Sequence, residues 1–150
     1  MTSRALSAGS PTTGGAREPD MKKLRIVVAD DSPVTLKALC LFLQRHARLE
    51  VVGTAADGAE AVFRAETLLP DLVLTDLEMP VLDGLEAARH IRARFPNTRI
   101  VVTSSREDES WREVSRISGA DEFVTKRELE VCWIPLVSRL FAERRFRAAC

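Results

Sequence analysis

The sequence predicts an α/β fold in which helices cover both faces of one parallel sheet. Five short apolar runs alternate with segments of helical character, and each run is apolar throughout instead of alternating with polar residues. Runs of that kind are typical of strands buried on both faces of a parallel sheet. Five such strand–helix units predict a doubly wound sandwich of five strands and five helices.

The first half of the chain provides three of these strands and two of the helices. Ser32-Pro33 begins a helix that we expect to run to about Arg45, because serine suits the N-cap and proline the first helical turn. Asp57-Gly58 turns into a second helix, from about Ala59 to Leu68. The three strands are expected at Leu24–Ala29, Glu50–Ala55 and Leu72–Thr75.

The second half contains two strands and three helices. Asp83-Gly84 precedes a helix to about Phe95, and a further helix runs from about Asp108 to Ile117. The last helix is expected to end near Arg147. Since proline breaks the interior of a helix, we expect Glu128–Trp133 to form a short turn or kinked segment and the main helix to start near Pro135. The two strands are expected at Ile100–Thr103 and Glu122–Thr125.

The composition indicates one globular domain behind a polar tail. A chain of 150 residues favours one domain, and its 45% hydrophobic content is sufficient for a core. Residues 1–21 are rich in Ser, Thr, Gly, Pro and Ala and show no secretory signal, so we expect a disordered tail before a domain at 22–150.

The charge balance and the cysteines limit the binding partners and the cellular compartment that we expect for the protein. With 22 basic and 22 acidic residues, nothing global draws the chain to nucleic acid or to a membrane surface. The apolar runs are too short to span a bilayer. Cys40, Cys132 and Cys150 match no zinc spacing or disulfide framework, which favours a reduced, cytoplasmic compartment.

Polar residues stand at the carboxyl ends of four predicted strands, and these ends are where ligands bind in such folds. Asp30 and Asp31 follow the first strand, Asp76 the third, Thr103 the fourth and Lys126 the fifth. Three carboxylates in one pocket repel each other unless a cation joins them, and Mg²⁺ is the hard divalent cation that oxygen ligands hold. The alternative is that each acid is a solvated loop residue or a helix cap.

These residues, with the segment DLEMPVLDGLEA at 76–87, resemble the response-regulator receiver domain of two-component signalling, and a single-domain chemotaxis regulator in particular. The resemblance covers about 23–147. It implies a flavodoxin-like sheet with strand order 2-1-3-4-5. It also implies that Asp76 is the phospho-acceptor and that Asp30 and Asp31 bind Mg²⁺, with Asp76 and the backbone carbonyl of Glu78 as further ligands.

The resemblance assigns the other positions as well. Thr103 and Lys126 match the residues that bond the phosphoryl oxygens, and Phe123 matches an aromatic switch position, although a buried core phenylalanine is the plainer interpretation. The chain departs from the family at Arg127, where proline is usual, and at Ser104, where a small residue such as alanine is usual.

The function implied is a stand-alone response regulator. Asp76 would accept a phosphoryl group from a histidine kinase or histidine phosphotransfer domain, and the output would be a change in protein–protein binding by a monomer or weak dimer. Too few residues follow Lys126 for a DNA-binding domain, which needs ~50 residues or more. The chain would assist its own phosphorylation and dephosphorylation without being an enzyme, and Glu78 and Ser105 would flank the path of the attacking water.

Two alternatives stay open at the level of sequence. A Mg²⁺-dependent aspartyl-phosphate phosphatase would share the nucleophile, metal and lysine, but it typically has a second aspartate where this chain has Glu78. A receiver-shaped binding module that is never phosphorylated is the other alternative.

The first helix is unusually apolar, which suggests either a wide buried face or a docking face for a four-helix-bundle partner. Residues expected outside the sheet-facing side are Leu36, Cys40 and Leu41, and those expected to face the sheet are Thr35, Ala38, Leu39, Phe42 and Leu43.

Overall fold

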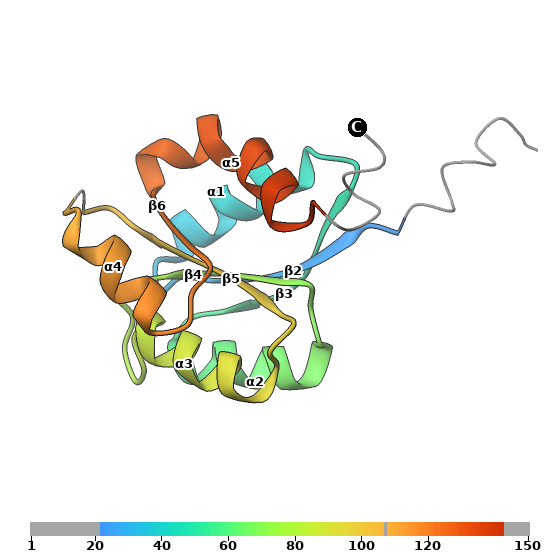
Figure 1. Ribbon diagram of the computed structural model, residues 1–150. Coiled ribbons are helices and arrows are strands. Elements are labelled where there is room, and N and C mark those ends of the chain that lie inside the picture. Colours follow the sequence, from blue (N-terminus) through green and yellow to red (C-terminus); the bar gives the residue numbers. More distant parts are fainter. Residues whose placement is uncertain (1–21, 107, 143–150) are drawn as a thin grey trace, which may run out of the picture.

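The computed structural model describes residues 22–106 and 108–142, and it has the expected α/β sandwich (Figure 1). One sheet of five parallel strands has the order β3-β2-β4-β5-β6, which in chain order is the predicted 2-1-3-4-5. The expected tail at 1–21 lies outside the described residues. The strands are β2 (Leu24–Ala29), β3 (Leu49–Ala55), β4 (Leu72–Asp76), β5 (Arg99–Ser104) and β6 (Glu122–Thr125), all within one residue of the predicted bounds.

Helices cover both faces of this sheet (Figure 1). On one face, α1 (Pro33–Gln44) and α5 (Lys126–Leu140) pack over a core that contains β2 and β4 residues such as Ile26 and Leu74. On the other face, α2 (Gly58–Leu68), α3 (Gly84–Arg94) and α4 (Ser110–Ile117) enclose a second core. The central strands are buried on both sides, as their continuous apolar sequences predict.

Side-chain caps set the start of each of the first three helices. The Ser32 hydroxyl accepts a hydrogen bond from the Thr35 amide at 3.2 Å, and the Asp57 carboxylate accepts one from the Glu60 amide at 2.7 Å. A capping box formed by Asp83 and Glu86 begins α3. Each cap satisfies an amide that the helix itself leaves without a partner, which fixes where the chain turns away from the sheet.

The prediction for the last helix was wrong. α5 begins at Lys126, directly after β6, and continues through Pro135 to Leu140, while Arg147 lies outside the described residues. A capping box of Thr125 and Glu128 begins the helix. Pro135 lies on the exposed side, where water can bond the carbonyl that proline leaves free. The opposite side buries Leu129, Trp133, Leu136 and Val137 at helical spacing, and this burial outweighs the proline.

The face of α1 also differs in part from the prediction. Leu39 and Leu43 are buried as expected, but Leu36 packs against the core and Ala38 is exposed. The exposed large apolar residues of this helix are Val34 and Leu41.

None of the helices in the described ranges is long and apolar enough to cross a membrane. Cys40 and Cys132 are half-buried free thiols, and Cys150 lies beyond the described residues.

Candidate functional site

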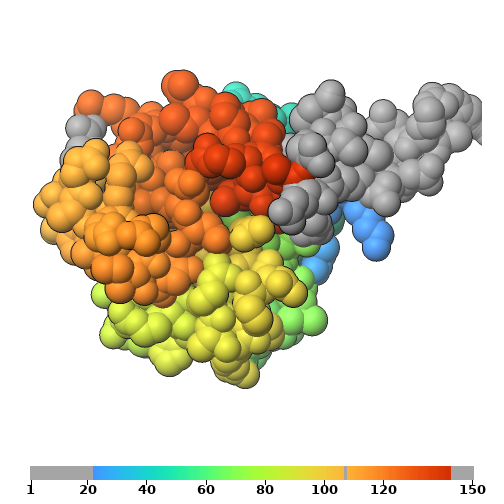
Figure 2. Space-filling model, in the orientation of Figure 1, coloured from blue at the N-terminus to red at the C-terminus, as the bar shows by residue number. Residues whose placement is uncertain are grey.

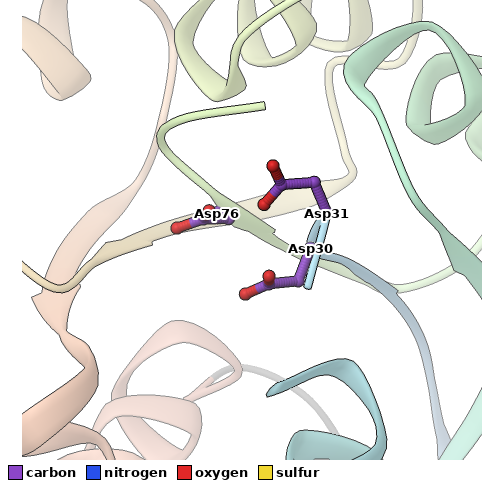
Figure 3. Close-up of side chains that lie close together, drawn as sticks. All are labelled: Asp30, Asp31 and Asp76. Atoms are coloured by element: carbon purple, nitrogen blue, oxygen red, sulfur yellow. The ribbon is translucent and has the colours of Figure 1, made fainter. Parts of the chain in front are cut away.

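Three carboxylates meet at the carboxyl ends of two neighbouring strands (Figure 3). Asp30 and Asp31 follow β2, and Asp76 is the last residue of β4. One carboxylate oxygen from each lies within 4.8 Å of the other two, although Asp30 is only 1% exposed and Asp76 only 7%. The predicted acidic cluster is therefore formed, and most of its negative charge is held away from water.

Lys126 brings a cation to this cluster from the start of α5. Its Nζ lies 2.8 Å from Asp30 Oδ2 and 3.4 Å from Asp76 Oδ1. The lysine reaches the acids because α5 begins directly after β6, so that the side chain starts at the same edge of the sheet. The departure from the family at Arg127 does not prevent this contact.

One lysine does not balance three carboxylates, and the pKa values reflect this. Burial and the neighbouring Asp30 charge raise the pKa of Asp76 to about 6, although Lys126 acts in the opposite direction. The pKa of Lys126 is raised as well. Burial of the ammonium lowers its pKa, but the bonds and charges of Asp30 and Asp76 outweigh that effect. A further cation at this position would relieve the repulsion between the carboxylates.

The donor set fits a magnesium ion. All the side-chain ligands are carboxylate oxygens, and exposed Asp31 leaves one side open to water, as Mg²⁺ prefers. The Glu78 side chain is not part of the cluster, since it is half exposed and pairs with Arg106 at 2.8 Å. Only the backbone of Glu78 can then contribute, as the resemblance implies.

Thr103 brings a hydroxyl to the same edge of the sheet as Asp76. It is paired with Asp76 across β4 and β5, and its carbonyl accepts a hydrogen bond from the Leu77 amide at 2.7 Å. The Thr103 Oγ1 atom is buried and has no hydrogen-bond partner among the described residues. A buried unpaired hydroxyl costs about 1–3 kcal/mol. Such a group next to a buried carboxylate is suited to a ligand oxygen that arrives later.

Close packing holds the backbone of Asp76 in place. A Cβ atom added at Gly84 would lie 2.1 Å from the Asp76 carbonyl oxygen, so only glycine fits at the first position of α3. The connecting segment also contains Val81, whose φ of 72° is unfavourable for a β-branched residue. Strain of this kind concentrates near functional sites.

Phe123 is buried, at 4% exposure, and is fastened by a residue that the sequence did not single out. The Arg112 guanidinium of α4 lies 5.7 Å from the centre of the Phe123 ring and donates a hydrogen bond to the Phe123 carbonyl at 2.7 Å. Arg112 also pairs with Glu128, which caps α5. No motif marks Arg112, because its role depends on how α4 packs on β6.

Comparison with protein families identifies the class. The family model described as the response regulator receiver domain matches residues 26–131, a range that contains every predicted site residue. The chain therefore belongs to the response regulator receiver domain family.

Curated relatives carry receiver-like sequence within longer chains. A protein-glutamate methylesterase/protein-glutamine glutaminase from Geobacillus kaustophilus (strain HTA426) is 38% identical over 71% of this chain and 31% of its own length. A protein of the same description from Koribacter versatilis (strain Ellin345) is 41% identical over 69% of this chain and 29% of its own length. The chain thus spans about a third of the length of these relatives.

Solved structures agree with the fold. The response regulator domain of CheB from Thermotoga maritima has a TM-score of 0.71 at 31% identity, covering 79% of this chain and 94% of that one. The CheX-CheY-BeF3-Mg complex from Borrelia burgdorferi contains a chain with a TM-score of 0.75 at 26% identity, covering 83% of this chain and 93% of that one.

Proposed function

We propose that Asp76 accepts a phosphoryl group from the phosphohistidine of a kinase or phosphotransfer domain, and that the protein signals as a phosphorylation-dependent switch in the cytoplasm. The observation that carries the proposal is the convergence of a desolvated carboxylate, a lysine and an unpaired buried hydroxyl at one point of the sheet edge. A structural ion-pair cluster has no need of an unpaired hydroxyl.

The transfer follows from the chemistry of these groups. An Asp76 oxygen bonds to phosphorus while the bond from phosphorus to the donor nitrogen breaks, and its electron pair returns to the imidazole. Phosphoryl transfer needs charge neutralisation more than covalent help. Lys126 and the Thr103 hydroxyl would bond phosphoryl oxygens. Mg²⁺, held by Asp30, Asp31, Asp76 and the Glu78 carbonyl, would neutralise the remaining negative charge.

The output would pass through the surface formed by α4, β6 and α5, which are coloured orange to red in Figure 2. When the phosphoryl group draws Thr103 toward it, the space beside Phe123 changes. Phe123 is already buried, so the expected effect is a tighter fit of Phe123 and its Arg112 contacts.

The phosphodonor would dock on a different surface, the exposed side of α1. On α1, Val34 is 80% exposed and Leu41 is 59% exposed. Large apolar side chains that are exposed on one helix favour a binding surface. We propose that a kinase or phosphotransfer helix bundle docks there. Leu41→Glu should weaken this binding without unfolding the chain, whereas Lys37→Glu, a change of charge at a polar position of α1, should weaken it less. Equal affinities for wild type and Leu41→Glu would contradict the docking face.

The experiment that tests the proposal is intact-mass measurement after incubation with a small phosphodonor and Mg²⁺. Wild type should gain one phosphoryl group per chain and Asp76→Asn none, while Thr103→Ala and Lys126→Ala should gain it more slowly. Labelled Asp76→Asn would show that another residue is the acceptor. Turnover of a small phosphoester would favour the phosphatase alternative, and a folded wild type that is never labelled would favour the binding module.

A further inference from the structure

A basic hollow lies at the end of α1 that is far from the acidic cluster. It forms where α1 turns into β3, with one residue of α5 as a side wall, and its volume is about 330 Å³. Because α1 has 12 residues, about 18 Å of helix separates the hollow from the acids that follow β2. The residues that line it are Arg45, His46, Ala47, Arg48, Leu49 and Ile134.

The two arginines of the basic hollow have no acidic partner. Neither the Arg45 nor the Arg48 guanidinium makes a hydrogen bond or an ion pair within residues 22–106 and 108–142. Arginines elsewhere in this part of the chain, such as Arg64, Arg92 and Arg139, pair with a carboxylate. Since a guanidinium group is always charged in proteins, the hollow holds two positive charges that the described residues leave unbalanced.

The His46 imidazole adds a polar group whose capacity is unused. Its Nδ1 atom is buried and has no hydrogen-bond partner among the described residues. The ring lies edge-on to Phe42, with 5.6 Å between the ring centres, and the Arg45 guanidinium lies 5.3 Å from the centre of the same Phe42 ring. Phe42 itself packs against the core. Two of the lining side chains are therefore positioned by one anchored ring, and a buried nitrogen among them lacks a partner.

Charge and shape indicate which ligand fits. The negative end of the α1 dipole amounts to about half an elementary charge, which the two arginines outweigh. The acid nearest in sequence, Glu50, follows Leu49 in β3, so its side chain points to the other face of the sheet. Leu49 is 4% exposed and Ile134 40% exposed, and together they give the hollow an apolar wall. An anion with an apolar body would use both parts of the surface.

The number of cations distinguishes between common anions. One guanidinium group balances a carboxylate, whereas a phosphate monoester carries a charge of about −1.5 to −2 at neutral pH. Its three terminal oxygens can also accept paired hydrogen bonds from more than one guanidinium group. Two unpaired arginines in one hollow therefore match a phosphate monoester better than a carboxylate.

We propose that the basic hollow binds a small organic phosphate. Arg45 and Arg48 bond the phosphate oxygens, and the apolar body lies against Leu49 and Ile134. Sites for small molecules are commonly about 300–1,000 Å³, so this hollow accepts a ligand of about one ring in size. The proposal does not rest on the proposed function of Asp76, because it involves neither the acidic cluster nor Mg²⁺.

Titration with phenyl phosphate tests the proposal. The probe is added to the full chain without Mg²⁺, and backbone amide signals are followed by nuclear magnetic resonance. Saturable shifts are expected at residues 45–49 and at Ile134. Arg45→Gln and Arg48→Gln each remove a charged donor and should weaken binding about tenfold. Both arginines lie at the surface, so the variants should stay folded, which the remaining amide signals verify.

Matched controls separate the site from general charge effects. Arg94→Gln removes the same charge from α3, on the other face of the sheet, where the arginine pairs with Glu66. Its affinity should equal that of wild type. Benzoate keeps the ring but has a single charge, and inorganic phosphate keeps the charge but lacks the ring. Each should bind about tenfold more weakly than phenyl phosphate.

Three results would overturn the proposal. The hollow is no anion site if phenyl phosphate gives no saturable shift at residues 45–49, or if both Arg45→Gln and Arg48→Gln bind it as wild type does. Benzoate that binds as tightly as phenyl phosphate would contradict the preference for a phosphate group. Inorganic phosphate that binds equally well would contradict the contribution of the apolar wall.

Discussion

Asp121 precedes β6 at the amino-terminal edge of the sheet, and Asp76 ends β4 at the carboxyl-terminal edge. Asp121 accepts bonds from Arg92 Nη2 at 2.6 Å, Arg99 Nη1 at 3.4 Å and the Ile100 amide at 2.8 Å. Asp76 shares a single lysine with Asp30 and lies near Asp31. Asp121 thus has two cationic partners of its own, whereas Asp76 shares one cation with another carboxylate.

This difference separates a structural cluster from a functional one. At the amino-terminal edge, Arg92 also donates to the carbonyls of Gly119, Pro96 and Thr98, so its fork fastens α3 to the turn before β6. Both oxygens of the Asp121 carboxylate have partners there without a ligand. At the carboxyl-terminal edge, excess negative charge and the unpaired Thr103 hydroxyl leave bonds that a metal ion and a phosphoryl group would make under the proposed function.

The largest effect on stability should come from the satisfied edge. Asp121→Ala removes two ion pairs and the bond to the Ile100 amide, so unfolding free energy should fall by about 2 kcal/mol or more. Denaturant titration measures this. Glu113→Ala breaks the exposed pair with Arg116 and should leave the unfolding free energy nearly unchanged. Equal losses in the two variants would show that the Asp121 cluster is no more than a surface pair.

Packing behind the acceptor should give the next effect. In Gly84→Ala the new Cβ meets the Asp76 carbonyl, so we expect a loss of about 2 kcal/mol and slower phosphorylation. Gly53→Ala is the control, because its Cβ meets mainly the end of the flexible Leu68 side chain. If Gly84→Ala is as stable and as readily labelled as wild type, the acceptor is not held in place by this contact.

The unbalanced edge should make stability depend on pH when no metal is bound. Since the pKa of Asp76 is raised from 3.8 to about 6, the folded state binds more protons than the unfolded state between these values. Unfolding free energy should therefore fall as the pH rises through this window. Asp76→Asn should match wild type near the acid end and be more stable than it at neutral pH. Parallel pH profiles would contradict the raised pKa.

The smallest effect concerns the strained loop. Val81→Gly removes the penalty of a positive φ, partly offset by the entropy of glycine, so a gain of about 0.5 kcal/mol is expected. Val131 is similarly exposed but helical, and Val131→Gly should instead lose about 0.5 kcal/mol. Thermal unfolding of the two variants measures whether Val81→Gly raises stability while Val131→Gly lowers it.

The sequence predicted the strands and the convergence of the candidate site residues because their signals are local. Apolar runs marked β2 to β6, and Asp30, Asp31, Asp76, Thr103 and Lys126 stood at strand ends that a parallel sheet must bring together. The contacts made by loops and helices that are distant in sequence were not predictable. The Glu78–Arg106 pair and the Arg112 contact with Phe123 depend on loop paths and on the placement of α4, for which no spacing rule exists.

Helix α5 shows how one local rule can mislead. Pro135 suggested a break because interior proline removes a helix hydrogen bond and crowds the preceding turn, but burial on the opposite side of the helix outweighs that cost. The sequence contains the Thr125–Glu128 capping box, and this motif predicts a helix that starts at Lys126. The burial of Trp133 depends on the neighbouring α1 and the sheet, which sequence periodicity alone does not supply.

Under the proposed function, the carboxyl-terminal edge of the sheet is an incomplete charge cluster that a metal ion would complete. Thermal unfolding at neutral pH during Mg²⁺ titration tests it. Wild type should be stabilised by about 2.7 kcal/mol at a Mg²⁺ concentration 100 times the dissociation constant. Asp31→Asn removes an exposed ligand without touching the Lys126 contacts, and its melting temperature should hardly respond. A wild type that Mg²⁺ does not stabilise, or an Asp31→Asn variant stabilised to the same degree, would contradict the account.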